Sequence, residues 1–160
     1  MLSLTKKTEY ALIAMCYLWE RRNQTVSARE IAEAFSMPLS LMMNILKTLH
    51  HSELLSSSRG TKGGYRLTGD LSKISLHKLI EDLEGPVRLT ECSDAEDPRE
   101  IANRACRMNP GCPIQKPLHA LHGRMVSFLK DVKLSDIIGP GNDAPAELVG
   151  NARACAHASA

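Results

Sequence analysis

Aromatic side chains are scarce in this sequence, which has two Phe, three Tyr and one Trp among its 160 residues. This scarcity argues against a protein that binds single-stranded nucleic acid by stacking bases on aromatic rings. Long apolar runs are also missing, because no stretch approaches the roughly 18 residues that cross a bilayer. The apolar stretch 11–19 is similar to a secretion signal, but Glu20, Arg21 and Arg22 occupy the place of a cleavage site. We therefore expect a cytoplasmic protein without membrane attachment.

Sequence signatures of enzymes are missing as well. The five cysteines form no C-x-x-C pair, there is no glycine-rich phosphate loop, and no Ser, His and Asp can be placed as a catalytic triad. The 20 basic and 18 acidic residues give a net charge of +2, which is too small to identify a partner. Residues 1–70 are more basic than the rest, with nine Lys or Arg against six Asp or Glu. We expect a protein that is not an enzyme and whose first half is the better candidate for an anionic partner.

Apolar residues make up 43% of the chain, and much of their spacing is that of helices with one buried face. This pattern predicts four early helices, over 5–20, from 27 onward, over 38–51 and over 75–84. Ser27 and Glu30 form the S-x-x-E signature of a capped helix start. Residues 54–67 predict two short strands around a turn rich in glycine and positive charge. The predicted fold class is mainly α with a small β-wing, a winged helix-turn-helix followed by a long C-terminal dimerisation helix.

This arrangement suits double-stranded DNA, because a helix fits the major groove and a basic turn can contact phosphates or the minor groove. The third predicted helix has a polar outer side, and the start of the first helix can hold backbone phosphates. The candidate DNA-binding residues are Thr5, Lys6, Ser40, Asn44, Lys47, Arg59, Lys62 and Tyr65. The alternative is a small three-helix domain whose basic turn is solvated and which contacts other proteins.

Apolar residues between 113 and 132 recur at alternating spacings of four and three, the pattern of a coiled-coil seam. They are Ile114, Leu118, Leu121, Met125, Phe128 and Val132. A lone helix with such a seam needs a partner, most simply a second copy, so we expect a homodimer. The expected organisation is a DNA-binding domain over 1–86, a cysteine-bearing loop over 87–112, a dimerisation helix with a short cap over 113–138 and a flexible tail over 139–160.

Three short motifs carry a family resemblance. They are Leu4-Thr5-Lys6 with Tyr10-Ala11-Leu12, Arg59-Gly60 followed by Gly63-Gly64-Tyr65, and Ser127-Phe128-Leu129. Over residues 1–138 the chain resembles the Rrf2 family of winged-helix transcriptional regulators, which includes the iron–sulfur regulators IscR and NsrR. The resemblance implies a homodimer that crosses its long helices and binds a partly palindromic operator. One departure is Ser52-Glu53 in place of an Asn/Asp-Gly pair, which puts a negative charge before the wing.

Cys92, Cys106 and Cys112 lie in a stretch without regular periodicity. The resemblance implies that three cysteines of this region hold an iron–sulfur cluster, since thiolates are the ligands such clusters need. Cys106 and Cys112 keep the family's C-x5-C spacing, whereas thirteen residues, including the acidic insert 93–100, separate Cys92 from Cys106. Three thiolates with one oxygen ligand, as in NsrR-like members, favour a 4Fe–4S cluster over 2Fe–2S.

The resemblance offers two choices for the fourth ligand. In IscR-like members it is a histidine three residues after the last cysteine, where this chain has Gln115, a poor iron ligand. In NsrR-like members it is an acidic residue of the first helix, contributed by the other subunit, and the matching residue here is Glu9. The resemblance therefore implies Glu9, with His119 and His122 in reserve. The alternative is that Glu9 is a solvated helix carboxylate.

Other interpretations of the cysteines stay open. The last two of the three, with the two histidines that follow, also fit a loose zinc site. Cys16 is expected in the core, and Cys155 in the tail has no expected role. The resemblance implies a repressor whose operator binding is controlled by a cluster that senses redox state, nitric oxide or iron–sulfur status. The alternative is a regulator of the same fold that is switched by thiol oxidation without a cluster.

Overall fold

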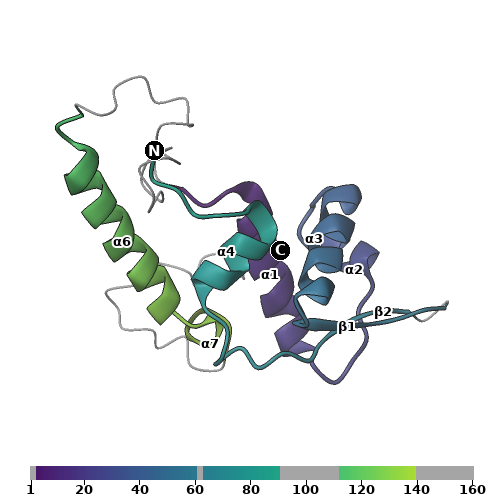
Figure 1. The fold of residues 1–160 in the computed structure, drawn as a ribbon. Coiled ribbons are helices and arrows are strands. Elements are labelled where there is room, and N and C mark those ends of the chain that lie inside the picture. Colours follow the sequence, from purple (N-terminus) through teal and green to yellow (C-terminus); the bar gives the residue numbers. More distant parts are fainter. Residues whose placement is uncertain (1–2, 61–62, 91–111, 140–160) are drawn as a thin grey trace, which may run out of the picture.

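The computed structural model describes residues 3–60, 63–90 and 112–139, so the predicted tail beyond 139 lies outside it. Its elements are α1 (Lys6–Glu20), α2 (Ala28–Ala34), α3 (Leu39–His51), β1 (Leu55–Ser58), β2 (Gly64–Leu67), α4 (Leu76–Glu84), α6 (Gln115–Asp131) and α7 (Leu134–Ile137). The hairpin of β1 and β2 projects from one side of the helices, and α6 lies on the opposite side (Figure 1). Within the described residues, no helix is both long and apolar enough to cross a membrane.

The first helices begin where the sequence predicts, because polar side chains cap their starts. The hydroxyl oxygen of Thr5 accepts a hydrogen bond from the backbone N–H of Thr8 at 3.2 Å. That of Ser27 accepts from the N–H of Glu30 at 3.1 Å, which is one half of the predicted capping box. Each cap satisfies a backbone donor that a helix start leaves unpaired.

The core forms where α1, α3 and α4 pack together. The inner side of α3 is fully buried, as its spacing predicts, through Met42, Ile45, Leu46 and Leu49. Burying side chains of this size stabilises the fold by about 1.5–3 kcal/mol each. Because this side of α3 is held in the core, the opposite side is fixed toward the outside of the molecule.

The two predicted strands form an antiparallel hairpin, the wing, in which Ser58 pairs with Gly64 next to the turn. Val26, between α1 and α2, exchanges two backbone hydrogen bonds of 2.9 and 2.8 Å with Tyr65 of β2. Gly64 is required beside this pairing, because a Cβ atom there would lie 2.4 Å from the carbonyl oxygen of Val26. The base of the wing is therefore attached to the helical body.

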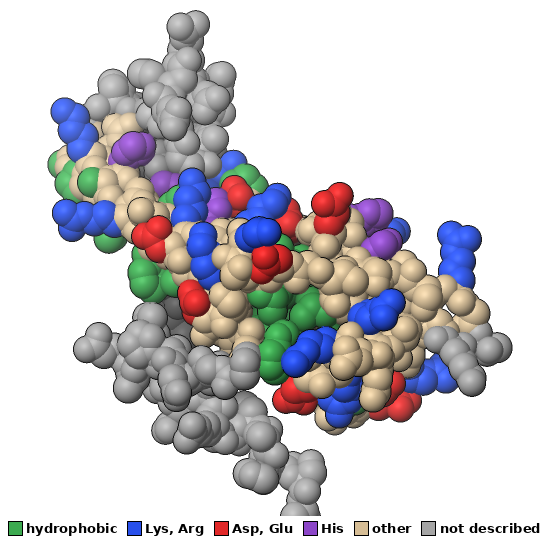
Figure 2. Space-filling model, turned by 90° about the horizontal axis from the view of Figure 1, so that it is seen from below, with side chains coloured by type: hydrophobic (Ala, Val, Ile, Leu, Met, Phe, Trp, Pro, Cys, Tyr) green, Lys and Arg blue, Asp and Glu red, His purple; other side chains and the backbone are tan. Residues whose placement is uncertain are grey.

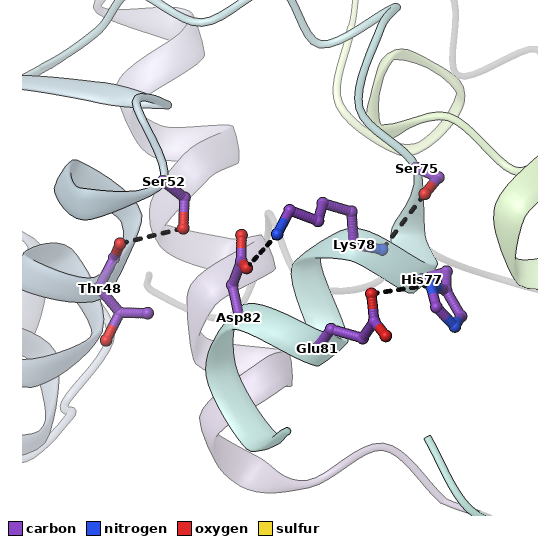
Figure 3. Close-up of polar contacts among 7 residues, drawn as sticks. All are labelled: Thr48, Ser52, Ser75, His77, Lys78, Glu81 and Asp82. Atoms are coloured by element: carbon purple, nitrogen blue, oxygen red, sulfur yellow. Dashed lines mark hydrogen bonds and ion pairs between the residues drawn. The ribbon is translucent and has the colours of Figure 1, made fainter. Parts of the chain in front are cut away.

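The helix α4 begins after Ser75, which caps it, and ends at Gly85, whose φ of 86° favours glycine. Two side-chain contacts with i, i+4 spacing lie on different flanks of it (Figure 3). They are the Lys78–Asp82 ion pair at 2.7 Å and the His77–Glu81 contact at 3.2 Å, in which the histidine is charged only when protonated. Both boundaries of this helix agree with the sequence prediction.

The long helix α6 packs against α4 and brings the chain back to the core (Figure 1). The backbone N–H of Leu134 donates to the carbonyl of Ile74 at 2.9 Å, and that of Leu76 donates to the carbonyl of Val132 at 2.9 Å. Leu134 and Ile138 are fully buried. The predicted short cap after the long helix is thus a docked element, α7, that closes the core at the start of α4. Together these elements confirm the predicted fold class, mainly α with a small β-wing.

Candidate nucleic-acid interface and ligand positions

The outward side of α3 is polar and open. Ser40, Asn44 and Lys47 are exposed and lie opposite the buried row. Their i, i+4, i+7 spacing places them on one face of the helix. The ion pairs among the described residues do not involve Lys47. Three of the predicted DNA-binding side chains therefore form one accessible surface.

The wing adds positive charge beside this surface. Arg59 is exposed directly after β1, whereas Lys62 lies outside the described residues. Figure 2 shows basic side chains at the wing end of the molecule. Arg66 of β2 is also exposed, and sequence reasoning missed it. Its outward direction could have been predicted from strand alternation, because the neighbouring Tyr65 and Leu67 pack against the core. Because the Tyr65 side chain is half-buried, its contact with DNA stays a prediction.

His50 connects the last turn of α3 to the wing. Its Nδ1 lies 2.8 Å from the carbonyl oxygen of Leu55, and its Nε2 lies 3.3 Å from the hydroxyl oxygen of Ser57. Nδ1 must donate to the carbonyl, which leaves Nε2 to accept from the hydroxyl when the ring is neutral. Sequence reasoning missed this residue, because only the turn between α3 and β1 brings these groups together.

The start of α1 lies against the end of α4. The Thr5 hydroxyl donates to Oε1 of Glu84, and the Thr8 hydroxyl lies 3.5 Å from the same oxygen. The ammonium group of Lys7 donates to the carbonyl of Leu83. Because Thr8 is also buried, these contacts fix the first turn of α1 relative to the last turn of α4.

Two predicted phosphate contacts, Thr5 and Lys6, lie at the start of α1. Thr5 is exposed, but its hydroxyl is engaged as the cap and in the contact with Glu84. Lys6 pairs with Glu9 at 2.6 Å, and the hydrogen bond to this carboxylate raises the pKa of Lys6 above its ordinary value. Both side chains of the pair are solvent-exposed. Solvent screens such an exposed pair and leaves it little net stabilisation, so Glu9 can leave Lys6 for another partner at little cost.

Cys112 is the predicted cysteine ligand that lies within the described residues, whereas Cys92 and Cys106 lie outside them. Cys112 is half-buried, and its carbonyl accepts from the N–H of Gln115 at the start of α6. The described part of the chain contains no group of three His, Cys, Asp or Glu side chains that could hold a metal ion. The complete predicted ligand set therefore stays a prediction.

The reserve ligands lie farther along α6. His119 is exposed, whereas His122 is buried and its Nδ1 has no hydrogen-bond partner among the described residues. A helix rises 1.5 Å per residue, so His122 lies about 10 Å along the axis from Gln115. This separation makes His122 a poor companion for Cys112.

Cys16 lies in α1, half-buried against the core. Burial raises the pKa of its thiol, and the nearby Glu20 carboxylate adds to the shift. The neutral thiol is the less reactive form. This agrees with a packing role for Cys16 rather than a ligand role.

Comparison with known proteins gives one consistent family. A profile of the Rrf2 family, described as an iron-dependent transcriptional regulator, matches residues 4–140. The chain is 28% identical over 141 residues to the HTH-type transcriptional regulator NsrR of Oceanobacillus iheyensis, covering 86% of this chain and 90% of that protein. It is 28% identical over 138 residues to the HTH-type transcriptional regulator IscR of Vibrio atlanticus, covering 86% and 75% respectively.

The fold is also that of a solved structure. CymR, the global cysteine regulator of B. subtilis, matches with a TM-score of 0.60 and 22% identity, over 86% of this chain and 96% of CymR. The matches confirm the resemblance and the expectation that the chain is not an enzyme. Because the family profile covers most of the chain, the chain belongs to the Rrf2 family of winged-helix, DNA-binding transcriptional regulators.

Proposed function

We propose that the chain is a cytoplasmic, homodimeric repressor whose affinity for its operator is controlled by an iron–sulfur cluster. The observation that carries this proposal is the contact between the start of α1 and the end of α4. The first turn of α1 contains Glu9, which in this proposal serves the cluster of the other subunit, and the chain that leaves α4 leads to Cys92, which serves the cluster of its own subunit. Since α1 also packs against α3, a change at these ligands has a short route to the DNA-binding surface.

Operator binding is assigned to the outward side of α3 and to the wing. Ser40, Asn44 and Lys47 carry the hydrogen-bonding and charged groups that read base edges in a major groove or hold phosphates. Arg59 in the wing is long enough to contact a phosphate or to enter a minor groove. The exposure of all four side chains supports this assignment.

A homodimer is supported by an apolar stripe on α6. Ile114, Leu121 and Phe128 follow one another at intervals of seven residues, and each is more than half exposed. An exposed line of large apolar side chains is typical of an interface. Heptad spacing is typical of a helix that pairs with another long helix. We assign a second copy of α6 as the partner, because the two copies would offer each other the same stripe.

Cys92, Cys106, Cys112 and Glu9 are assigned as the cluster ligands. Three soft thiolates suit iron, and Glu9 can supply an oxygen because its present partner is an exposed lysine. Glu9 lies in the first turn of α1 and Cys112 just before α6, and helix dipoles favour anionic ligands at such positions. When bound, the cluster supplies a group whose charge and ligation change with oxidant or nitric oxide. Its proposed type is 4Fe–4S.

The pairing of Glu9 with Lys6 suggests how binding of Glu9 to the cluster could change the affinity for DNA. The Glu9 carboxylate cannot neutralise Lys6 fully while it is engaged elsewhere. Lys6 then stays an uncompensated cation at the start of α1, where it can bind a phosphate. In this proposal the cluster-loaded protein binds the operator more tightly than the cluster-free protein. It therefore acts as a repressor that leaves the operator when the cluster is lost.

Counting iron and sulfide in the full chain, purified without oxygen, tests the ligand assignment. About four of each per chain indicates 4Fe–4S, and about two indicates 2Fe–2S. We expect Cys106→Ala to remove the visible chromophore and leave a folded dimer. Cys16→Ala is the matched control, and its iron content should equal that of the unaltered chain.

Two results would contradict the assignment. A Cys106→Ala protein with full iron content would remove Cys106 from the ligand set. An unaltered chain that stays colourless and free of iron, even after attempted reconstitution, would replace cluster sensing with regulation by thiol oxidation.

A further inference from the structure

Met43 is an unusual side chain in the middle of α3, a helix that the structure describes completely. It is 53% exposed. Every other apolar side chain of α3 is either buried or packed against the core. Single exposed apolar residues are common on protein surfaces. Exposure alone therefore does not indicate a function for Met43, and its place on the helix has to be considered as well.

Met43 lies at the edge of the polar outward face of α3. It follows Ser40 by three residues and precedes Lys47 by four, the spacings that make neighbours on a helix surface. On its other side lies Leu46 of the buried row, three residues further along, so Met43 borders the core-facing side of the helix. A helix that enters the major groove with Ser40 and Lys47 toward the bases must carry Met43 in with them.

The chemistry of methionine limits what it can recognise there. Its thioether is a weak acceptor and donates no hydrogen bond. Among the major-groove edges of the four bases, thymine presents an apolar group, its C5 methyl. Removing both apolar surfaces from water is favourable, and the flexible methionine chain adapts to the contact.

We propose that Met43 is a specificity-determining residue that contacts a thymine methyl group in each half of the operator. This inference rests on the proposed operator binding through α3. Ser40, Asn44 and Lys47 read polar groups or phosphates, whereas Met43 distinguishes thymine from cytosine at one position. Because Met43 lies outside the core, its replacement leaves the fold intact.

The test begins with duplexes selected from a random pool by the full chain, purified without oxygen. Each thymine of the selected operator is then replaced by deoxyuridine, which removes only the methyl group. At one thymine per half-site, the affinity of the unaltered chain should fall about fourfold per methyl, the value expected for one buried carbon group. The other replacements should have little effect.

The variants assign that loss to Met43. Met43→Ala should bind thymine and deoxyuridine duplexes equally, and Met43→Leu should keep most of the difference. Phe35→Ala is the matched control, since Phe35 is a comparably exposed apolar residue at the end of α2, outside this face of α3. It should keep the fourfold ratio.

The outcomes separate this inference from the proposed function. If the unaltered chain enriches no sequence, operator binding itself is contradicted. If it enriches an operator but no deoxyuridine replacement matters, or Met43→Ala keeps the fourfold ratio, the role of Met43 is overturned and operator binding stands.

Discussion

His50 orients a whole element through two hydrogen bonds. Its ring holds the backbone of β1 at Leu55 and the hydroxyl of Ser57, so it determines how the wing sits beside α3. A protein that contacts one duplex with both a helix and a wing needs these two elements at a fixed angle. The side chain of His50 can therefore matter for operator affinity without touching the operator.

We expect His50→Ala to loosen the wing and leave the helices intact. A net hydrogen bond is worth about 0.5–1.5 kcal/mol, so losing two should weaken operator binding by about tenfold. Hydrogen exchange should be faster at the β1 and β2 amides. His51→Ala is the control, since His51 is the exposed neighbouring histidine, and its wing amides should exchange at the unaltered rate. Unchanged wing exchange in His50→Ala would contradict the bracing role.

At the scale of elements, α6 has two apolar surfaces. Leu129 and Val132 pack against the core of the same chain, whereas Leu121 belongs to the exposed stripe. The first surface explains why α6 packs against the core of its own chain. The second is left for a partner.

We expect Leu121→Glu to convert the proposed dimer to a folded monomer, because a carboxylate in the seam would be buried without a partner. Lys130→Glu makes a similar change on the opposite side of the helix and should leave the dimer intact. Analytical ultracentrifugation measures the oligomeric state of both variants, and circular dichroism checks that they are folded. A Leu121→Glu protein that remains dimeric would show that the stripe is not the interface.

Most of the fold could be predicted because its signals are local. The caps Thr5, Ser27 and Ser75 act on residues three positions away, and the inner row of α3 repeats within one helix. The docking of α7 could not be predicted, because Leu134 is buried by contacts with the region before α4, about sixty residues earlier. No repeating pattern in that short segment indicates such a distant partner.

In the candidate site, too, the local features could be predicted and the long-range contacts could not. The polar face of α3 follows from helical periodicity, and so does its exposure. The engagement of Thr5 with Glu84 joins residues 79 positions apart, so the sequence could suggest a phosphate contact for Thr5 but not this competing role. Arg66 was missed because DNA contacts were sought in the turn of the predicted hairpin and not along its second strand, whose alternation gives Arg66 an outward direction. His50 was missed because its partners Leu55 and Ser57 meet it only through the turn between α3 and β1.

At the scale of the whole molecule, three regions meet through α1. Its inner side packs against α3, its start contacts the end of α4, and its first turn contains the Lys6–Glu9 pair. The wing projects from one side of this body, and α6 lies on the other side (Figure 1). A change in the charge balance of the first turn of α1 therefore acts close to both the proposed DNA-binding surface and the proposed ligand Glu9.

The most direct test of the account measures operator affinity of the cluster-loaded and the cluster-free chain, without oxygen and over a series of salt concentrations. We expect the loaded dimer to bind more tightly. Its salt dependence should be steeper by about 2, because one added phosphate contact by Lys6 in each subunit contributes roughly 0.9. Lys6→Ala should remove that extra slope. Equal affinity and equal slope for the loaded and cluster-free chains would contradict control of operator binding by the cluster.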